Sequence, residues 1–180
     1  MPPAAPAARP PALAEATPAQ RELLREALAR HLPEVPPDLP NGMAPALLPI
    51  LHELQEALRF IPPALVPEIA QALNLSRAEV HGTITYYHHF RTTPPGRHVV
   101  QICQAEACRA NGAVALMAHA CERLACQPGE TRADGAVTLE PVYCLGLCAT
   151  GPSAMIDDAV RSRVTTAAID ALSQRIGNAP

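Results

Sequence analysis

Residues 142–152 read VYCLGLCATGP, and within them Cys144 and Cys148 are separated by three residues in a glycine-containing loop. A second pair, Cys103 and Cys108, has four intervening residues, and 35 residues lie between the two pairs. Each pair directly follows an expected β-strand, so two such loops at the same end of a small sheet would bring four thiolates together. The spacing of the cysteines therefore predicts an α/β domain with a metal centre at one end of its sheet.

The segments around the cysteines alternate between β-type and helical patterns. We expect strands over residues 98–103 and 136–143, helices over 111–124 and 165–176, and a hairpin made of 154–157 and 160–164. The resulting order, β-α-β-β-β-α, makes an α/β layer of roughly eighty residues, from 97 to 177. A domain of this size is close to the lower limit for folding without an additional cross-link such as a disulfide or a bound metal. A metal centre would supply such a cross-link.

The segment from residue 17 to residue 92 has a helical pattern and a different composition, since fifteen of the 21 prolines precede residue 68. Capping boxes at Thr17 and Ser76 open the first and the fourth of four expected helices, and apolar residues at i,i+4 spacing predict the two between them. The buried face of the fourth helix is expected at Val80, Ile84 and Tyr87. Short helices with short connections predict a small antiparallel helical bundle.

Residues 1–16 are rich in proline and alanine and have no hydrophobic periodicity, so we expect a disordered, linker-like arm. The turn-rich sequence TTPPG at residues 92–96 separates the expected bundle from the cysteine-bearing part. The predicted fold class is therefore an α+β chain in two parts, with an N-terminal helical bundle over 17–92 followed by an α/β domain over 97–177.

The charge balance and the lengths of the apolar runs exclude several classes of partner and location. Fourteen arginines, no lysine and seventeen acidic residues give a formal net charge of −3, which leaves no basic field for nucleic acid. The longest uncharged run, Pro141 to Ile156, is too short and too interrupted to span a bilayer. The first residues lack the apolar stretch of a secretory signal, so we expect a cytoplasmic protein. Its cysteines are then expected as metal ligands or reactive thiols rather than disulfides.

Four cysteine sulfurs suit either tetrahedral zinc or an iron–sulfur cluster. The pairs contain no compact C-x2-C element, so zinc is allowed but not favoured. Glycines at 146 and 151 let the backbone of the second loop approach the sulfides of a cluster, and this loop contains no carboxylate. A thiol–disulfide enzyme would need C-x-x-C, and a Rieske centre would need two histidine ligands, and neither pattern occurs in the two loops.

Other candidate residues have simpler interpretations. Cys121 and Cys126 form a second x4 pair, which we expect to pack as small apolar residues of a helix face. His88 and His89 are adjacent on an expected helix and point in different directions, so a role at the helix C-terminus is favoured over metal binding.

Several separate motifs carry a family resemblance. They are LLPILHELQEALRFIPP at 47–63, HGTITYYHHF at 81–90, the C-x4-C pair, VYCLGLC and SAMID. In order and spacing, residues 45–176 resemble the thioredoxin-like [2Fe-2S] ferredoxin subunits of NAD-linked oxidoreductases. That family includes the peripheral ferredoxin subunit of respiratory complex I, the diaphorase part of NAD-reducing hydrogenases and the gamma subunit of NAD-dependent formate dehydrogenase. The loop CQAEAC at 103–108 is most similar to the formate dehydrogenase branch, because complex I relatives usually carry Gly-Thr there.

The resemblance implies a thioredoxin-like domain in which Cys103, Cys108, Cys144 and Cys148 bind one [2Fe-2S] cluster. It also implies an electron-transfer subunit without catalytic residues of its own, in direct contact with a partner subunit that holds FMN, the NAD site and further Fe-S clusters. A molybdenum- or tungsten-dependent subunit would oxidise formate, so that the assembly converts formate and NAD+ to CO2 and NADH. The sequence itself has no dinucleotide or phosphate-binding fingerprint, which agrees with cofactors held by other chains.

Three alternatives remain open at this point. The chain could be the equivalent ferredoxin subunit of respiratory complex I, or that of an NAD-reducing hydrogenase. A more distant alternative is a structural zinc module that scaffolds a complex. The sequence also departs from the family pattern, with Tyr86 where phenylalanine is common and Asp157 where asparagine is usual.

Overall fold

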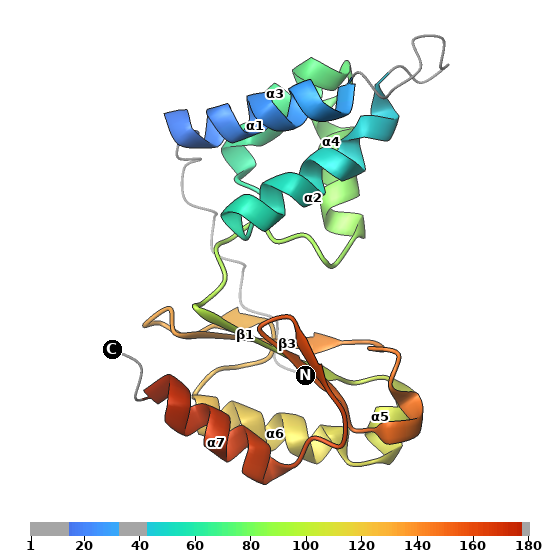
Figure 1. The fold of residues 1–180 in the computed structure, drawn as a ribbon, viewed down its shortest axis with the longest axis vertical. Helices are drawn as coiled ribbons and strands as arrows, with labels where there is room; N and C mark the ends of the chain where they lie inside the picture. Colours follow the sequence, from blue (N-terminus) through green and yellow to red (C-terminus); the bar gives the residue numbers. More distant parts are fainter. Residues whose placement is uncertain (1–14, 33–42, 178–180) are drawn as a thin grey trace, which may run out of the picture. The chain divides into compact units, whose positions relative to one another are not determined.

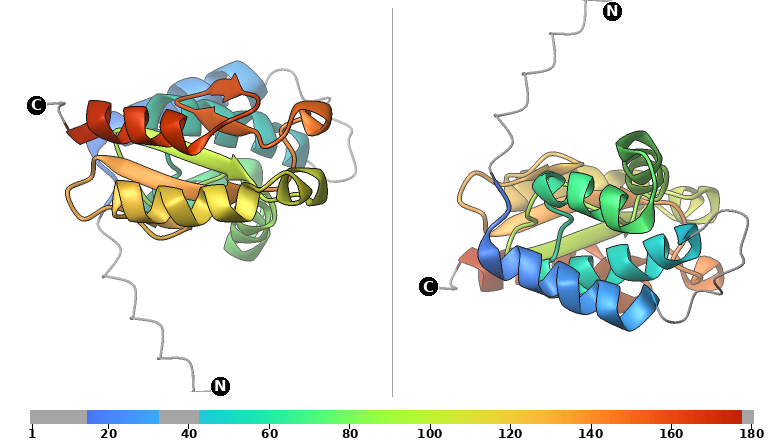
Figure 2. Two further views of the ribbon diagram at one scale, coloured as in Figure 1. Left: turned by 90° about the horizontal axis from the view of Figure 1, so that it is seen from below. Right: turned by 90° about the horizontal axis from the view of Figure 1, so that it is seen from above.

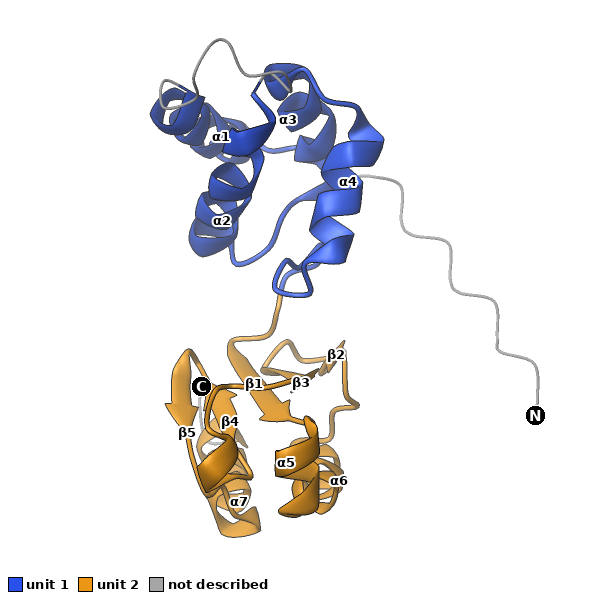
Figure 3. Cartoon of the chain, turned by 90° about the vertical axis from the view of Figure 1, so that its right-hand side faces the viewer, with its two compact units in different colours: residues 1–94 blue, residues 95–180 orange. Residues whose placement is uncertain are grey.

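The computed structural model describes residues 15–32 and 43–177, which divide between two compact units, residues 1–94 and 95–180 (Figure 3). The predicted arm over residues 1–16 lies almost entirely outside the described residues. Its last residue, Ala16, is buried in the apolar core of the first unit. Within the described ranges, no helix is long and apolar enough to cross a membrane.

The described part of the first unit has four α-helices, α1 to α4, and two short 3-10 turns (Figure 1). The helices are α1 (Pro18–His31), α2 (Leu47–Leu58), α3 (Val66–Leu73) and α4 (Arg77–Tyr86), and the turns are η2 (Ala44–Ala46) and η3 (Pro63–Leu65). Both predicted capping boxes are confirmed, because the Thr17 and Ser76 side chains each accept a hydrogen bond from the N3 backbone N–H, and the backbone N–H of each cap residue donates to the N3 side chain, Gln20 or Glu79. The helices share one aliphatic core that includes Ile50, Leu54, Leu65, Ile69 and Val80.

The segment after α4 differs from the prediction. Tyr87 was expected on the buried face of the helix, but α4 ends at Tyr86 and the Tyr87 side chain is 43 % exposed. Tyr87 has an extended backbone with ψ 102°, so its side chain leaves the helical stripe of Val80 and Ile84. His89 lies beyond the helix rather than in its last turn, and its ring packs against those of His52 and Phe90.

The second unit is a five-stranded sheet with the strand order β2-β3-β1-β4-β5. Its strands are β1 (His98–Cys103), β2 (Glu130–Thr131), β3 (Val137–Val142), β4 (Ala154–Ile156) and β5 (Ala159–Arg161), and its helices are α5 (Glu106–Ala110), α6 (Ala113–Leu124) and α7 (Thr166–Gly177). The predicted strands, hairpin and two long helices are confirmed to within a few residues. The short helix α5 and the two-residue strand β2 were not predicted.

Strands β1 and β3 are parallel neighbours at the centre of the sheet, and the other pairs are antiparallel. Helices α6 and α7 lie side by side against one face of this sheet (Figures 1 and 2). The core between them contains fully buried aliphatic side chains such as Val100, Ile102, Leu124, Leu139 and Ile169. The parallel β1–β3 pair therefore places the ends of two strands that are distant in sequence at one edge of the unit.

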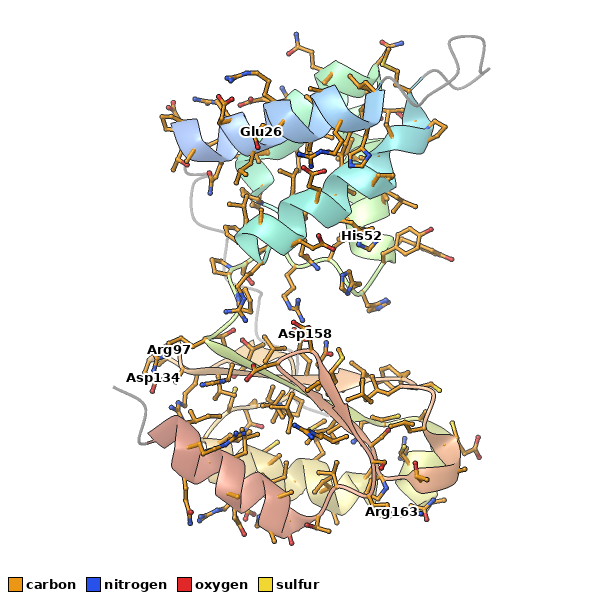
Figure 4. The ribbon with its side chains drawn as sticks, in the orientation of Figure 1. Glu26, His52, Arg97, Asp134, Asp158 and Arg163 are labelled. Atoms are coloured by element: carbon orange, nitrogen blue, oxygen red, sulfur yellow. The ribbon has the colours of Figure 1, made fainter. Side chains whose placement is uncertain are left out.

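A carboxylate in the turn before β3 links the stability of the second unit to pH. Asp134 accepts two hydrogen bonds of 2.8 Å from Arg132, whose Nη1 group also donates to the Leu124 carbonyl, and Asp134 lies close to Arg97 (Figure 4). The Arg132 bond, with a further bond from the Ala136 amide, lowers the pKa of Asp134 to about 2. Because this pKa is depressed, the stabilisation is complete above the ordinary value of 3.8 and is lost as the pH falls towards 2.

We therefore expect the substitution Asp134→Asn to flatten the fall of the urea midpoint between pH 4 and pH 2, measured by far-UV circular dichroism. The matched control is Glu122→Gln, which removes an exposed carboxylate from α6. A wild-type slope in Asp134→Asn, or an equally flattened slope in the control, would contradict the assignment.

Candidate metal centre

Cys103 and Cys144 are brought together by the parallel pairing of β1 and β3. Cys103 is the last residue of β1 and lies opposite Val142, the last residue of β3, and Cys144 follows two residues later. The Gln104 amide donates to the Val142 carbonyl over 2.7 Å, so the pairing continues past the end of β1. The two cysteines therefore leave the sheet at the same edge, as the sequence predicted.

Cys108 lies inside α5 and not in a loop, which corrects the prediction for the first pair. The sequence EACRA has no strong helix period over so short a length, but the turn is stabilised because Arg109 N–H donates to the Ala105 carbonyl. The Cys108 side chain is 1 % exposed, and its Sγ atom lies 3.5 Å from the hydroxyl of Ser153. Helix α5 thus turns Cys108 back towards Cys103, which is also 1 % exposed.

A small residue is required opposite Cys108. A Cβ atom added to Gly151 would lie 3.3 Å from Cys108 Sγ and 3.4 Å from its Cα atom, closer than most side-chain contacts. Glycine at 151 therefore leaves room beside the thiol of Cys108.

Cys144 and Cys148 form the second pair, and both are exposed. Their Sγ atoms are 3.7 Å apart, and the Gly146 amide donates to Cys144 Sγ over 3.4 Å. Gly146 has φ 79°, which glycine adopts without strain, and Cys144 itself has φ 99°. Two sulfurs on one tetrahedral metal ion with bonds of about 2.3 Å lie roughly 3.8 Å apart. The second pair thus already has the spacing of two thiolates on one metal ion.

The acid–base properties of the thiols show that the two pairs influence each other. Burial raises the pKa of Cys103, but hydrogen bonds with the Ala105 backbone, Cys108, the Cys144 backbone and Ser153 outweigh burial, so this pKa is lowered overall.

The pKa of Cys148 is raised, first by its hydrogen bond to Cys144 and then by the negative charges of Cys144, Cys108 and Cys103. Four thiolates at this edge would repel one another unless a cation neutralised them. The donor set therefore fits a cationic centre with sulfur ligands.

The four cysteines are arranged as two pairs. Cys144 and Cys148 share one short contact, and Cys103 is hydrogen-bonded to Cys108. Within the described ranges, no three His, Cys, Asp or Glu side chains gather as a site for a single metal ion. A [2Fe-2S] cluster with four cysteine ligands has two cysteine sulfurs on each iron, so residues arranged as two cysteine pairs fit this group.

Cys121 and Cys126 lie away from this edge, in the core between the sheet and the helices. Cys126 is 4 % exposed, with its Sγ 3.1 Å from the Glu130 carbonyl, and Cys121 packs against the same core. The prediction that both pack in the core is confirmed, with Cys121 half-buried, but Cys126 follows the end of α6 at Leu124 and does not lie on the expected helix face.

Ser153 was missed by the sequence analysis, although it is fully buried and interacts with both Cys103 and Cys108. The sequence feature that could have identified Ser153 is a polar residue at a position expected to be buried, directly before β4.

Comparison with known proteins identifies the family. Residues 36–176 match the family described as thioredoxin-like [2Fe-2S] ferredoxin. The chain is 34 % identical over 130 residues to a subunit of the NADH-quinone oxidoreductase of Escherichia coli, covering 72 % of this chain and 78 % of the relative. It is 30 % identical over 139 residues to a subunit of the NADH-quinone oxidoreductase of Thermus thermophilus, covering 77 % and 73 %.

The fold also matches a chain in the crystal structure of an NAD+-reducing [NiFe]-hydrogenase in the H2-reduced state, with a TM-score of 0.65 and 32 % identity. That match covers 77 % of this chain, which spans only 23 % of the hydrogenase chain. The family match extends over both described units and includes both cysteine pairs. The protein therefore belongs to the thioredoxin-like [2Fe-2S] ferredoxin family, a membership that implies a [2Fe-2S] cluster.

Proposed function

We propose that this chain is an electron-transfer subunit of a multi-subunit NAD-linked oxidoreductase, and that Cys103, Cys108, Cys144 and Cys148 hold its one [2Fe-2S] cluster. The observation that carries the proposal is the meeting of two cysteine pairs at the ends of adjacent parallel strands, with Cys144 and Cys148 Sγ atoms 3.7 Å apart. When bound, such a cluster accepts and returns one electron at a time.

The chain's own residues then bind and tune the centre. Cys103 and Cys108 are buried, which excludes water from one side, whereas Cys144 and Cys148 are exposed at the surface. The Gly146 amide donates to Cys144 Sγ, and the Ser153 hydroxyl lies beside Cys108. Hydrogen bonds to sulfur and solvent exposure are two of the factors that set the potential of an iron–sulfur centre. The exposed pair marks the side on which a partner subunit can approach.

We propose first the class of the parent complex and then one member of that class. The relatives named above are a subunit of NADH-quinone oxidoreductase and a chain of an NAD+-reducing hydrogenase, which supports an NAD-linked assembly. An FMN-containing partner subunit in direct contact with this chain is part of the proposal. Within this class we favour a cytoplasmic NAD-dependent formate dehydrogenase with a molybdenum or tungsten subunit. The support for that finer choice is the first ligand loop, CQAEAC, which lacks Gly-Thr.

The cofactor assignment is tested on the full-length chain purified under anaerobic conditions. We expect about two iron and two acid-labile sulfide ions per chain, visible absorption that bleaches on dithionite reduction, and an electron paramagnetic resonance signal from the reduced protein only. Colourless protein that contains zinc in place of iron would overturn the proposal and favour the structural zinc module.

The parent complex is tested by affinity purification of the tagged chain from its native cells. We expect a flavin-bearing subunit in the eluate and dye reduction that is driven by formate and by NADH. Dye reduction driven by hydrogen, or by NADH alone together with quinone-reducing subunits, would replace formate dehydrogenase with the corresponding alternative.

A further inference from the structure

Ser153 has a buried hydroxyl whose hydrogen-bond partners are cysteine sulfurs. The residue is 0 % exposed, so bulk water does not reach its hydroxyl. Among the described residues, this hydroxyl lies 3.5 Å from Cys108 Sγ and is also hydrogen-bonded to Cys103. A buried hydroxyl is normally paired, because an unpaired one costs the full free energy of its desolvation. The Ser153 hydroxyl therefore depends on the two buried cysteines for its hydrogen bonds.

The backbone on both sides of Ser153 is held by other segments of the second unit. The Ser153 carbonyl accepts from the Cys103 amide over 3.0 Å, and the next residue, Ala154, begins β4, which pairs with β1. On the other side, the Pro152 carbonyl accepts from the Val164 amide over 2.9 Å. The backbone therefore keeps the Ser153 side chain beside the buried cysteine pair.

The direction of the hydrogen bond is set when the cysteines bind metal. A free thiol can donate to a serine hydroxyl or accept from it, but a metal-bound cysteine is a thiolate without a proton. Cys108 is one of the side-chain hydrogen-bond partners of Cys103, and as a thiolate it has no proton to donate. Of the side-chain partners of Cys103, the Ser153 hydroxyl is then the donor that remains.

The buried cysteine pair needs such a donor more than the exposed pair does. Cys103 and Cys108 are each 1 % exposed, so water does not compensate negative charge on their sulfurs, whereas Cys144 and Cys148 are exposed. Burial disfavours the more negatively charged form of a group, which is the reduced form of a one-electron centre. A hydroxyl that donates to sulfur opposes this effect, because its hydrogen bond stabilises the more negative, reduced form more than the oxidised form.

We propose that Ser153 is a positioning residue of the metal centre, whose buried hydroxyl donates to the sulfur of Cys108 and thereby raises the reduction potential of the centre. The inference deepens the proposed function and rests on it. Ser153 acts through the ligand Cys108, so its loss leaves all four cysteine ligands in place. The centre without this hydroxyl is harder to reduce.

The test compares reduction potentials of the full-length chain, purified under anaerobic conditions and titrated in the presence of redox dyes while the visible absorption is recorded. Ser153→Ala is expected to lower the equilibrium constant for one-electron reduction about tenfold, which corresponds to a potential lower by about 59 mV. The matched control is Thr150→Val in the second cysteine loop. The Thr150 hydroxyl donates to the Leu147 carbonyl over 3.3 Å, so its loss is expected to change the same constant by less than about twofold.

A second pair of variants separates the hydroxyl from the volume of the side chain. Ser153→Thr retains a hydroxyl, and Ser153→Val has nearly the same shape as threonine without it. We expect the potential of Ser153→Val to fall as in Ser153→Ala, and that of Ser153→Thr to stay near the wild-type value. Urea unfolding of the same variants gives the structural readout. A hydroxyl that contributed only to packing would change the unfolding midpoint and leave the potential unchanged.

Three results would overturn this role of Ser153. They are an unchanged potential in iron-loaded Ser153→Ala, equal potentials for Ser153→Thr and Ser153→Val, and loss of iron from Ser153→Ala, which would make the hydroxyl a requirement for assembly of the centre. The iron content of the wild-type chain separates this inference from the proposed function. Wild type without iron would overturn the proposed function, whereas iron-loaded variants with the wild-type potential would overturn the role of Ser153 alone.

Discussion

Replacement of Cys108 by serine is expected to abolish the bound iron and the visible absorption of the purified chain. The Cys108 side chain is 1 % exposed, with its Sγ hydrogen-bonded to Cys103 and 3.5 Å from the Ser153 hydroxyl. A serine hydroxyl is not ionised at neutral pH and is a poor ligand for a soft iron–sulfur centre, so one of the two metal positions would lose half of its protein ligands. The measurement is iron and sulfide analysis together with the visible spectrum of protein purified anaerobically.

The matched control for this prediction is Cys126→Ser. Cys126 is also a buried cysteine, with its Sγ 3.1 Å from the Glu130 carbonyl, but it lies in the core and away from the cysteine edge. A serine hydroxyl at 126 can donate to the same carbonyl, so we expect a full complement of iron and at most a modest loss of stability. Iron retained in Cys108→Ser, or lost equally in Cys126→Ser, would be incompatible with the assigned ligand set.

The elements that could be predicted from sequence are those whose signals are local. Strand β1 was predicted at residues 98–103, because its apolar run is bounded by a turn-rich joint and a cysteine loop. The helix starts at Thr17 and Ser76 were predicted for a similar reason, since a capping box uses only the cap residue and the third residue after it.

The elements that could not be predicted depend on contacts made in the folded chain. Helix α5 has five residues, too few for an independent helical signal, and β2 has two. Strand β2 exists because Glu130 and Thr131 pair with Leu139 and Thr138 of β3. Tyr87 was assigned to the helical stripe because the periodicity of the sequence continues past the point where the backbone leaves the helix.

The candidate site likewise has a part that could be predicted from the sequence and a part that depends on contacts in the folded chain. The parallel arrangement of two strands places their following loops at one edge, so the meeting of Cys103 and Cys144 followed from the order of the elements. No sequence motif indicates that Ser153 contacts two cysteines. Its position beside them depends on the antiparallel pairing of β4 with β1.

The first unit contains a buried amide whose loss is expected to lower its stability substantially. Gln55 on α2 is 5 % exposed. Its Nε2 atom donates to the His89 carbonyl over 2.6 Å, and its Oε1 atom accepts from the Arg91 amide over 2.7 Å. The Arg91 carbonyl in turn accepts from the Ile61 amide over 2.7 Å. The Gln55 side chain therefore satisfies a backbone carbonyl and a backbone amide in the segment after α4. In a sheet, a neighbouring strand would provide these hydrogen bonds.

Gln55→Leu is expected to lower the free energy of unfolding by about 2–4 kcal/mol, because a backbone donor and a backbone acceptor each lose a partner while the leucine gains little new apolar contact. The effect is measured by urea unfolding followed by far-UV circular dichroism. Hydrogen exchange at the Arg91 amide should accelerate together with the loss of stability.

The control for this substitution is Glu56→Leu, the same new side chain at the next and exposed position of α2. Because both variants add leucine to one helix, intrinsic helix propensity changes little between them and cannot account for a difference. We expect Glu56→Leu to remain within about 0.5 kcal/mol of wild type. Equal urea midpoints for the two variants would mean that water or a rearranged loop satisfies the His89 carbonyl and the Arg91 amide. The Gln55 side chain would then contribute packing alone, and the segment after α4 would owe its position to the ring contacts of Phe90.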